Sequence, residues 1–273
     1  MLSTMLAARL GRGEPVTADR VTAVVQRNIS ALRSGPSYWL VLASGFFEPL
    51  LYLLSIGVGV GSLVGDLTLD DGRTLPYEQF VAPAMLAVSA ASGALAETTY
   101  NFFFKFKYLR TYEAMLATPV RPMEIAVGEL TWALLRGSLY TGIFLAVMVA
   151  LGLTSAGWAL VAFPATLLVG VAFGAVGMAV STLMRGWQDF DLMNTAQFAL
   201  LLFSGTFSPV QDYPAAFRLL VELTPMFHAV ELLRGLTIGQ LTLGLAGNTA
   251  YLLVMTAAGL TFAGRRLARI LCE

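Results

Sequence analysis

The 273-residue sequence has little charge, since Asp, Glu, Lys and Arg make up only 12% of it. A soluble domain of ordinary composition carries about 25% charged residues. The mean hydropathy of +0.72 is high as well, so the sequence predicts an integral membrane protein. Its 17 basic and 17 acidic residues balance. This balance argues against nucleic acid as a partner, because phosphate binding requires a basic surface.

Lysine, cysteine and histidine are scarce. The only lysines are Lys105 and Lys107, so the sequence has no G-x-x-x-x-G-K-[ST] loop, and we expect neither ATP hydrolysis nor a bound cofactor in this chain. Cys272 is the only cysteine, which excludes an intrachain disulfide and leaves the redox compartment open. His228 is the only histidine, and a metal site needs more ligands than the chain offers.

Apolar runs long enough to cross a bilayer are abundant. A spanning helix needs roughly 20 apolar residues to cover about 30 Å of hydrocarbon. We expect an all-α, polytopic membrane protein whose six-helix domain occupies residues 38–264, with a short fifth span. The six predicted spans are Tyr38–Val60, Phe80–Tyr100, Ile125–Leu151, Ala159–Leu183, Leu192–Phe207 and Leu241–Phe262.

The basic residues predict the orientation of these spans, because Lys and Arg concentrate in cytosolic loops. Thirteen of them lie in the N-terminal segment, the loop around Lys105, the fourth-to-fifth loop and the tail. The opposite loops contain only Arg73, Arg218 and Arg234. We therefore predict that both termini and the Lys105 loop lie in the cytosol, and that the chain is a multi-pass protein of the inner (plasma) membrane.

Three segments flank or interrupt the spans. Residues 1–37 are predicted to be a cytosolic segment in which Thr17–Arg33, with apolar residues at helical spacing, forms an amphipathic helix along the inner face. Residues 265–273 are the predicted cytosolic tail. Residues 208–240 are expected to be outer re-entrant helices, separated by Pro209, Pro214 and Pro225 and packed on the spans, since irregular backbone at membrane depth needs protein or water around it.

The loop of residues 101–124 is the longest charged segment between two apolar runs. Drawn as one helix, residues 101–117 have a polar side that faces water or a soluble partner. Thr118-Pro119 ends this helix, because proline lacks an amide donor and biases the preceding residue out of the helical region. Amphipathic connecting loops are common in polytopic proteins. The pattern alone therefore does not decide whether this loop binds a soluble partner or only connects two spans. The apolar side holds Phe102, Phe106, Leu109, Tyr112 and Leu116, and the polar side holds Lys107, Arg110 and Thr111.

Two charges lie deep within the predicted spans, Glu48 before Pro49, and Arg136. A charge at this depth costs a few kcal/mol on insertion scales, so Glu48 should face the bundle interior or a seam between two copies. The two charges are candidates for an ion pair. Four more carboxylates border basic residues around the 101–124 loop, and we expect them to form solvated or partner-facing ion pairs. They are Glu97, Glu113, Glu124 and Glu129.

Several stretches occur in an order and spacing that match a known family. They are Phe47–Leu54 running into Gly57–Gly61, Tyr112–Pro119, Gly128-Glu129 followed by Trp132, Ser204–Phe207, and Thr224-Pro225 leading to His228, Glu231 and Arg234. Over roughly residues 20–266 the chain resembles the membrane subunits of type-2 ABC exporters, in the lipo-oligosaccharide exporter branch that contains nodulation protein J. No single stretch is specific, but their order and spacing are.

The resemblance implies a cytosolic coupling helix that docks on separate ATP-binding subunits, two per transporter, which bind ATP and Mg. It also implies a second permease chain, identical or homologous. It places the docking surface on Lys107, Arg110, Thr111, Tyr112, Glu113, Thr118 and Pro119. It places Glu48, Pro49 and Tyr52 at the pathway or the seam between permeases, and Phe207, Ser208, Pro209 and His228 near an outer gate. Ser208 departs from the family pattern, in which a second aromatic residue is expected.

We therefore predict a permease subunit of an ATP-driven exporter that moves an amphipathic, lipid-linked or drug-like substrate out of the cell, with membrane lipid around it. A stand-alone ion-coupled carrier is an alternative, but it would need more titratable groups at depth than Glu48 and Arg136. An intramembrane hydrolase is a second alternative, with His228 acting on Ser204 or Ser208, although neither serine lies in a recognisable nucleophile turn.

Overall fold

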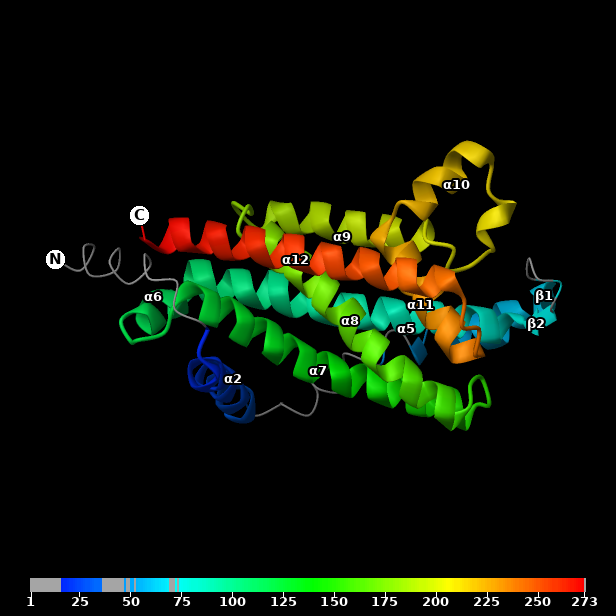
Figure 1. Ribbon diagram of the computed structural model, residues 1–273, viewed down its shortest axis with the longest axis horizontal. Coiled ribbons are helices and arrows are strands. Elements are labelled where there is room, and N and C mark those ends of the chain that lie inside the picture. The colour runs from blue at the N-terminus through cyan, green and yellow to red at the C-terminus, as the bar shows by residue number, and fades with distance from the viewer. Residues whose placement is uncertain are drawn as a thin grey trace.

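The computed structural model describes residues 16–35, 47, 50–51, 53–68, 72 and 74–272. The described chain is an elongated bundle in which most helices run along the long axis (Figure 1). Most of the predicted first span lies outside the described residues, as do Glu48, Pro49 and Tyr52. Its described part forms the π-helical turns η1 (Leu53–Val60) and the short helix α4 (Gly61–Val64).

Four described helices are long and apolar enough to cross a membrane, and they match the second, third, fourth and sixth predicted spans. The predicted fifth span is α9 (Gln188–Leu202), whose 15 residues are fewer than the roughly 20 that a crossing needs. The four are Tyr77–Tyr108, which begins with α5 (Tyr77–Ala96), α7 (Pro122–Ala150), α8 (Ala156–Ser181) and Leu243–Leu267 within α12 (Leu243–Cys272).

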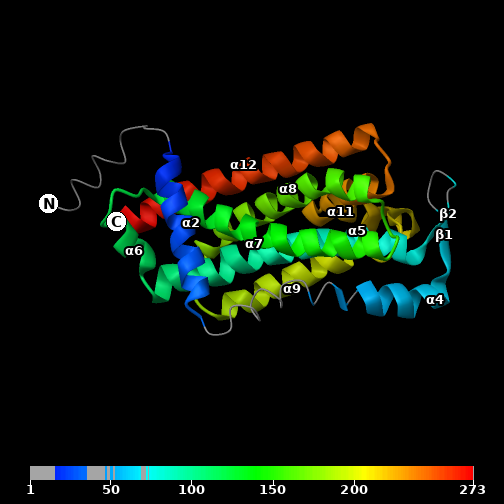
Figure 2. The ribbon, with the colours of Figure 1, turned by 90° about the horizontal axis from the view of Figure 1, so that it is seen from below.

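One end of the bundle carries α2 (Ala18–Arg33), α6 (Thr111–Leu116) and the C-terminal end of α12 (Figure 1). Figure 2 shows α2 lying across the long helices at this end. Gly128 on α7 allows the close approach of α2, because a Cβ at this position would lie 2.7 Å from the Cβ of Val24. The helix predicted from Thr17–Arg33 is confirmed, with Val24, Val25 and Asn28 buried.

The opposite end carries the shorter elements. The hairpin of β1 (Asp66–Thr68) and β2 (Thr74–Pro76), paired antiparallel with Leu67 opposite Leu75, had no signal in the sequence. The segment after α9 contains η4 (Val210–Asp212), α10 (Ala215–Glu222) and α11 (Pro225–Ile238), which begin next to the three prolines expected to separate them. Helix α11 packs on α5, α8 and α12, whereas α10 stands away from the bundle (Figure 1).

The single helix predicted over residues 101–117 is wrong. The α5 helix continues through the π-helical turns η2 (Glu97–Asn101) and η3 (Phe104–Tyr108), and Arg110 then adopts a left-handed conformation with φ of 47° before α6 begins. The apolar spacing runs on through the break, so the pattern alone gave no sign of it. The helix breaks because α6 folds back and buries Tyr112 in the bundle.

The core has two parts. The larger part surrounds α5, which has 14 of its 20 residues buried, and draws on α7, α8 and α11. The smaller part lies under α6 and contains Phe102, Tyr112, Ile125, Met178 and Leu267. Because α5 is enclosed on most sides, its surroundings are protein more than lipid.

A glycine contact between α12 and α8 provides a test of this packing. A Cβ at Gly259 would lie 2.8 Å from the backbone carbonyl carbon of Ala175, so Gly259→Val must force the two helices apart. We expect a loss of about 1–3 kcal/mol of stability, the usual cost of overpacking, seen as a lower melting temperature of the purified chain. Gly247→Val on the same helix, where nothing lies within 4 Å, is the control. Equal losses in the two variants would contradict the packing.

Candidate functional site

The segment of residues 109–121, here named the α6 loop, leaves the bundle through a strained turn. Arg110 is the only non-glycine residue with positive φ in the described chain. Such a conformation costs roughly 1–2 kcal/mol for an L-residue, and it persists only where the surrounding structure imposes it. Tyr112 supplies this constraint, because its side chain is fully buried and its ring lies 5.0 Å from that of Phe102.

The predicted docking residues divide into exposed and buried groups. The side chains of Arg110 and Glu113 are 75% and 59% exposed, with 4.0 Å between Nε of Arg110 and Oε1 of Glu113. Thr118 and Pro119 are also exposed. The structure corrects the assignment of Thr111 and Tyr112, which are buried within the chain and so hold α6 in place instead of offering a surface.

The other end of the predicted docking set is Lys107. Its ammonium group donates a hydrogen bond to the backbone carbonyl of Arg185 and lies 5.5 Å from the ring centroid of Phe103. Tyr108 and Leu109 are 49% and 57% exposed beside it. The sequence analysis did not identify these two residues as exposed. It placed Leu109 on the apolar side of a continuous amphipathic helix, and such a helix does not form here.

A buried ion pair connects three elements behind the α6 loop. The Lys105 ammonium lies 2.6 Å from Oε2 of Glu129 on α7 and donates to Oδ1 of Asn28 on α2 at 2.9 Å. The two charged side chains are only 15% and 4% exposed. Since a buried charge is costly without its partner, this pair fixes the positions of η3, α7 and α2 relative to one another.

Glu124 makes a second junction between α2 and α7. Its Oε2 accepts a hydrogen bond from the Arg121 amide at 2.9 Å, and its Oε1 accepts one from the Thr17 amide at 3.1 Å and lies 3.5 Å from Arg20. The expectation that the four carboxylates near this loop form solvated or partner-facing pairs is therefore wrong for Glu124 and Glu129. Both are buried against partners in the same chain, and only Glu113 faces solvent.

Arg136 pairs with Glu97, the remaining carboxylate of that set, and because Glu97 is buried, the expectation of a solvated or partner-facing pair is wrong for it too. Its guanidinium donates to Oε1 of Glu97 and to the Tyr140 hydroxyl, and the two charged side chains are 14% and 6% exposed. The suggested partner Glu48 lies outside the described residues. Because Arg136 is neutralised within the bundle, it adds nothing to a relay of free titratable groups such as an ion-coupled carrier needs.

The residues assigned to the outer gate lie near a buried arginine. The guanidinium of Arg234 donates to the carbonyl of Gly205 at 2.8 Å, lies 2.5 Å from Oε1 of Glu231, and is 3.8 Å from the ring centroid of Phe80. The Phe207 carbonyl accepts a hydrogen bond from the Tyr77 hydroxyl at 3.1 Å. Next to Phe207, Ser208 is partly exposed and Pro209 is buried. These contacts tie residues 204–209 to α5 and α11.

His228 is used for packing. Its Nδ1 is 2.8 Å from Oδ1 of Asn248, and its ring stacks on Tyr251 with 3.9 Å between centroids. The Ser204 hydroxyl interacts with the Thr206 hydroxyl at 2.7 Å and with the Leu201 carbonyl. In the described part of the chain, no hydrogen bond joins His228 to a serine, and no group of three His, Cys, Asp or Glu residues is placed to hold a metal ion.

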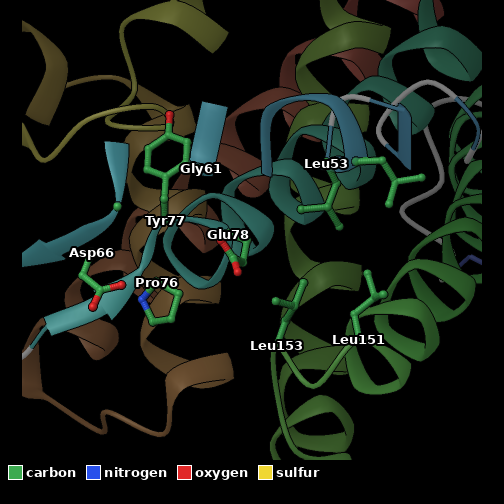
Figure 3. A pocket seen from close by; sticks show the side chains of 10 residues that line it. Leu53, Gly61, Asp66, Pro76, Tyr77, Glu78, Leu151 and Leu153 are labelled. Atoms are coloured by element: carbon green, nitrogen blue, oxygen red, sulfur yellow. The ribbon is translucent and has the colours of Figure 1, made fainter. Parts of the chain in front are cut away.

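A pocket of about 470 Å³ opens at the end of the bundle that carries the hairpin (Figure 3). Leu53 and Leu54 of η1 form one apolar wall, and Leu151 and Leu153 of the α7–α8 turn form another. The carboxylates of Asp66 and Glu78 supply its charged groups. An apolar cavity with a few polar groups suits a molecule that has an apolar body and a polar part.

The long helices of the described chain indicate its class. A bundle that contains four described helices long and apolar enough to cross a bilayer is that of a multi-pass membrane protein. The model of the ABC-2 type transporter family matches residues 19–238. The chain belongs to this family and is a permease subunit of an ABC exporter.

Individual relatives agree with this assignment. The chain is 36% identical to nodulation protein J of Rhizobium leguminosarum bv. viciae over 195 residues, which cover 71% of this chain and 73% of that protein. It is 35% identical to nodulation protein J of Rhizobium meliloti over 195 residues, covering 71% and 72%. It is also 25% identical to the inner membrane transport permease YadH of Escherichia coli K12 over 184 residues, covering 66% and 69%.

The buried pair behind the α6 loop can be tested by removing one charge. Glu129→Gln leaves the Lys105 ammonium buried without a counter-charge, and we expect a loss on the order of 3 kcal/mol. Thermal unfolding of the purified chain measures it. Glu113→Gln is the matched control, because an exposed ion pair contributes little. A Glu129→Gln variant as stable as Glu113→Gln would refute the role of the pair.

The pKa of Tyr112 makes a prediction at alkaline pH. Burial raises this pKa well above its ordinary value of 10, the negative charge of Glu129 adds to the rise, and Arg27 opposes it. The folded chain therefore keeps the phenol protonated where the unfolded chain loses the proton. The stability contributed by Tyr112 is complete below pH 10 and is lost as pH rises further, by up to about 1.4 kcal/mol per unit.

Comparison with Tyr112→Phe isolates this effect, because the other tyrosines are common to both chains. Between pH 10 and 11 the unfolding free energy of the original chain should fall more steeply than that of the variant. Parallel curves in a denaturant titration would show that Tyr112 ionises as readily in the folded chain as in the unfolded one.

Proposed function

We propose that this permease is driven by a separate ATP-binding subunit that docks on the α6 loop from the cytosol. The observation that carries the proposal is the combination of an exposed charged turn and a buried anchor. Arg110 and Glu113 face outward, while Tyr112 between them is fully buried. A push on such a turn reaches the bundle without first being absorbed by a flexible loop.

The sidedness rests on the basic residues. Helix α2, the α6 loop and the C-terminal end of α12 share one end of the bundle (Figure 1), and they hold eight of the 15 arginines. Both lysines lie in η3, which Lys105 joins to α2 at the same end. Cytosolic loops are enriched in these residues. We therefore place this end in the cytosol and the β1–β2 hairpin on the outside of the inner (plasma) membrane, with both termini cytosolic.

The assembly is proposed to contain two permease chains, identical or homologous, and two ATP-binding subunits that hold ATP and Mg. Helix α9 favours a second permease, because it is exposed along most of its length. The seam would then lie along α9 and the predicted first span, which contains Glu48, Pro49 and Tyr52. ATP-driven closure of the ATP-binding subunits changes which end of this seam is open, with the ATP site and the seam coupled through two states of the whole bundle.

The exported molecule is proposed to be amphipathic, lipid-linked or drug-like. The likeness to nodulation protein J over more than two thirds of the chain supports a cargo of the kind carried by the lipo-oligosaccharide exporter branch. The pocket between η1 and the α7–α8 turn agrees with this class, since its leucines suit an acyl or ring system and its carboxylates suit a polar group.

Charge reversal at the α6 loop tests the docking proposal. We expect Arg110→Glu and Glu113→Arg each to reduce the amount of ATP-binding subunit that co-purifies with the permease by about tenfold, the effect of about 1.4 kcal/mol in binding. Both residues are exposed, so the melting temperature should be unchanged. Arg218→Glu, an exposed arginine on α10 at the opposite end of the bundle, is the control and should retain the subunit.

Two further measurements strengthen the test. The double variant Arg110→Glu/Glu113→Arg restores the pair within the chain but not the charge pattern offered to a partner, so it should still lose the subunit. A membrane-impermeant thiol reagent should fail to label a cysteine placed at Thr118 in intact cells. Normal co-purification in both single variants, or labelling of residue 118 from outside, would overturn the proposal.

A further inference from the structure

Helix α9 is weakly attached to the rest of the bundle. Of its 15 residues only Phe190 is buried, whereas Leu192 is 72% and Phe198 is 55% exposed. Beyond its first turn, α9 is held by two hydrogen bonds, from Gln197 to Ser92 of α5 at 2.7 Å and from Tyr100 of η2 to Asn194 at 2.8 Å. It lies at the edge of the bundle in Figures 1 and 2. Met193, Leu200 and Leu201 of α9 are partly buried and pack against the larger part of the core. An element with a single fully buried residue is still among the easiest to displace.

The first turn of α9 is the exception, because aromatic rings hold it. We name Tyr100, Phe103, Tyr108, Trp187 and Phe190 the ring cluster. Trp187 stacks on Tyr108 with 5.6 Å between centroids, and Phe190 stacks on Tyr100 at 4.3 Å. Phe103 meets the edges of Phe190 at 5.2 Å and of Trp187 at 6.3 Å. Aromatic pairs in these geometries attract one another beyond the area that they bury.

A polar link runs beside the rings. The Lys107 ammonium donates to the carbonyl of Arg185, just before α9. The Asp189 carboxylate accepts hydrogen bonds from the amides of Arg185 at 2.6 Å and Gly186 at 3.3 Å. The turn before α9 is therefore hydrogen-bonded to the first turn of α9. A displacement of Arg185 or Trp187 would then move the start of the helix with it.

The segment from Phe102 to Tyr108, which contacts α9 through its rings, also contacts the α6 loop. Phe102 packs on Tyr112 of α6 at 5.0 Å, whereas the next residue, Phe103, belongs to the ring cluster. Tyr108 precedes the left-handed Arg110 by two residues. The π-helical turns η2 and η3 connect these points, and such turns occur often at functional sites. The segment from Phe102 to Tyr108 thus joins α6 to α9.

We propose that Tyr108 and Trp187 are positioning residues whose ring stack couples the α6 loop to α9. This inference rests on the proposed function. The other reading of exposed tyrosine and tryptophan at the end of a membrane helix is an anchor in the bilayer interface. An anchor needs only exposure, whereas transmission needs the Tyr108–Trp187 stack itself, so the two readings predict different behaviour.

The experiment follows α9 in the complete permease–ATPase complex in lipid nanodiscs. In a Cys272→Ser background, a spin label is attached to Leu192→Cys on α9, and its spectrum is compared with Mg-ATP under non-hydrolysing conditions and without nucleotide. A label at Leu135→Cys, exposed on α7, is the control. We expect a nucleotide-dependent change at residue 192 and none at residue 135.

The variants then separate the readings. Trp187→Ala should reduce the change at residue 192 about tenfold while the ATP-binding subunit stays bound, a loss within the usual range of coupling between sites. Trp187→Phe keeps an aromatic ring and should restore most of the change. Tyr108→Leu removes the same stack from the other side and should behave like Trp187→Ala.

The outcomes are distinct. A full nucleotide-dependent change in both Trp187→Ala and Tyr108→Leu would overturn the inference while leaving the proposed function intact. If Tyr108 were only an anchor in the bilayer interface, Tyr108→Leu would keep the full nucleotide-dependent change at residue 192, because leucine is also an exposed apolar residue. If the unsubstituted permease retains no ATP-binding subunit, the proposed function fails, and the inference fails with it.

Discussion

The Lys105–Glu129 ion pair is the interaction on which the proposed cytosolic end depends. A charge that is mostly removed from solvent must keep its counter-charge close, and here the two come from η3 and α7 while Asn28 of α2 shares the ammonium. Three segments that are far apart in the sequence are thereby held in one arrangement. The α6 loop starts four residues after Lys105, so its strained turn at Arg110 is built on a fixed base.

Buried cations also hold the other parts of the bundle together. Arg136 joins α7 to the end of α5 through Glu97, and Arg234 joins α11 to the beginning of α5 through Phe80 and to the 204–209 segment through Gly205. Both ends of the central helix are thus fixed by a paired or stacked guanidinium. Helix α9 receives no such interaction in the described chain. It is connected by rings at one end, by two hydrogen bonds further along, and by the partly buried Met193, Leu200 and Leu201. The bundle therefore combines a rigid centre with one loosely held helix.

The sequence predicted the elements whose signal is local. Apolar runs located four long helices, prolines located the breaks in residues 208–240, and the order of motifs located the family. It failed where the answer depends on distant residues. Glu124 and Arg20 are 104 positions apart, so a carboxylate beside basic residues looked solvated. The break at Arg110 follows from the burial of Tyr112, and an unbroken apolar spacing cannot predict it. Arg110, Glu113, Thr118 and Pro119 lie on the surface, as expected. Thr111 and Tyr112 do not, because α6 folds back and buries them.

The composition of α9 is compatible with the second permease chain that we propose as its neighbour. Asp191 and Thr195 are exposed, and their spacing of four places them on one face of the helix. A carboxylate facing hydrocarbon costs several kcal/mol, so lipid is a poor environment for this face near Asp191. Water or another polar protein surface satisfies it. In the proposed assembly the same face would line the seam between two permeases, where a helix must be both wettable and free to move. Weak attachment to its own bundle and a polar outer face are then two consequences of a single requirement.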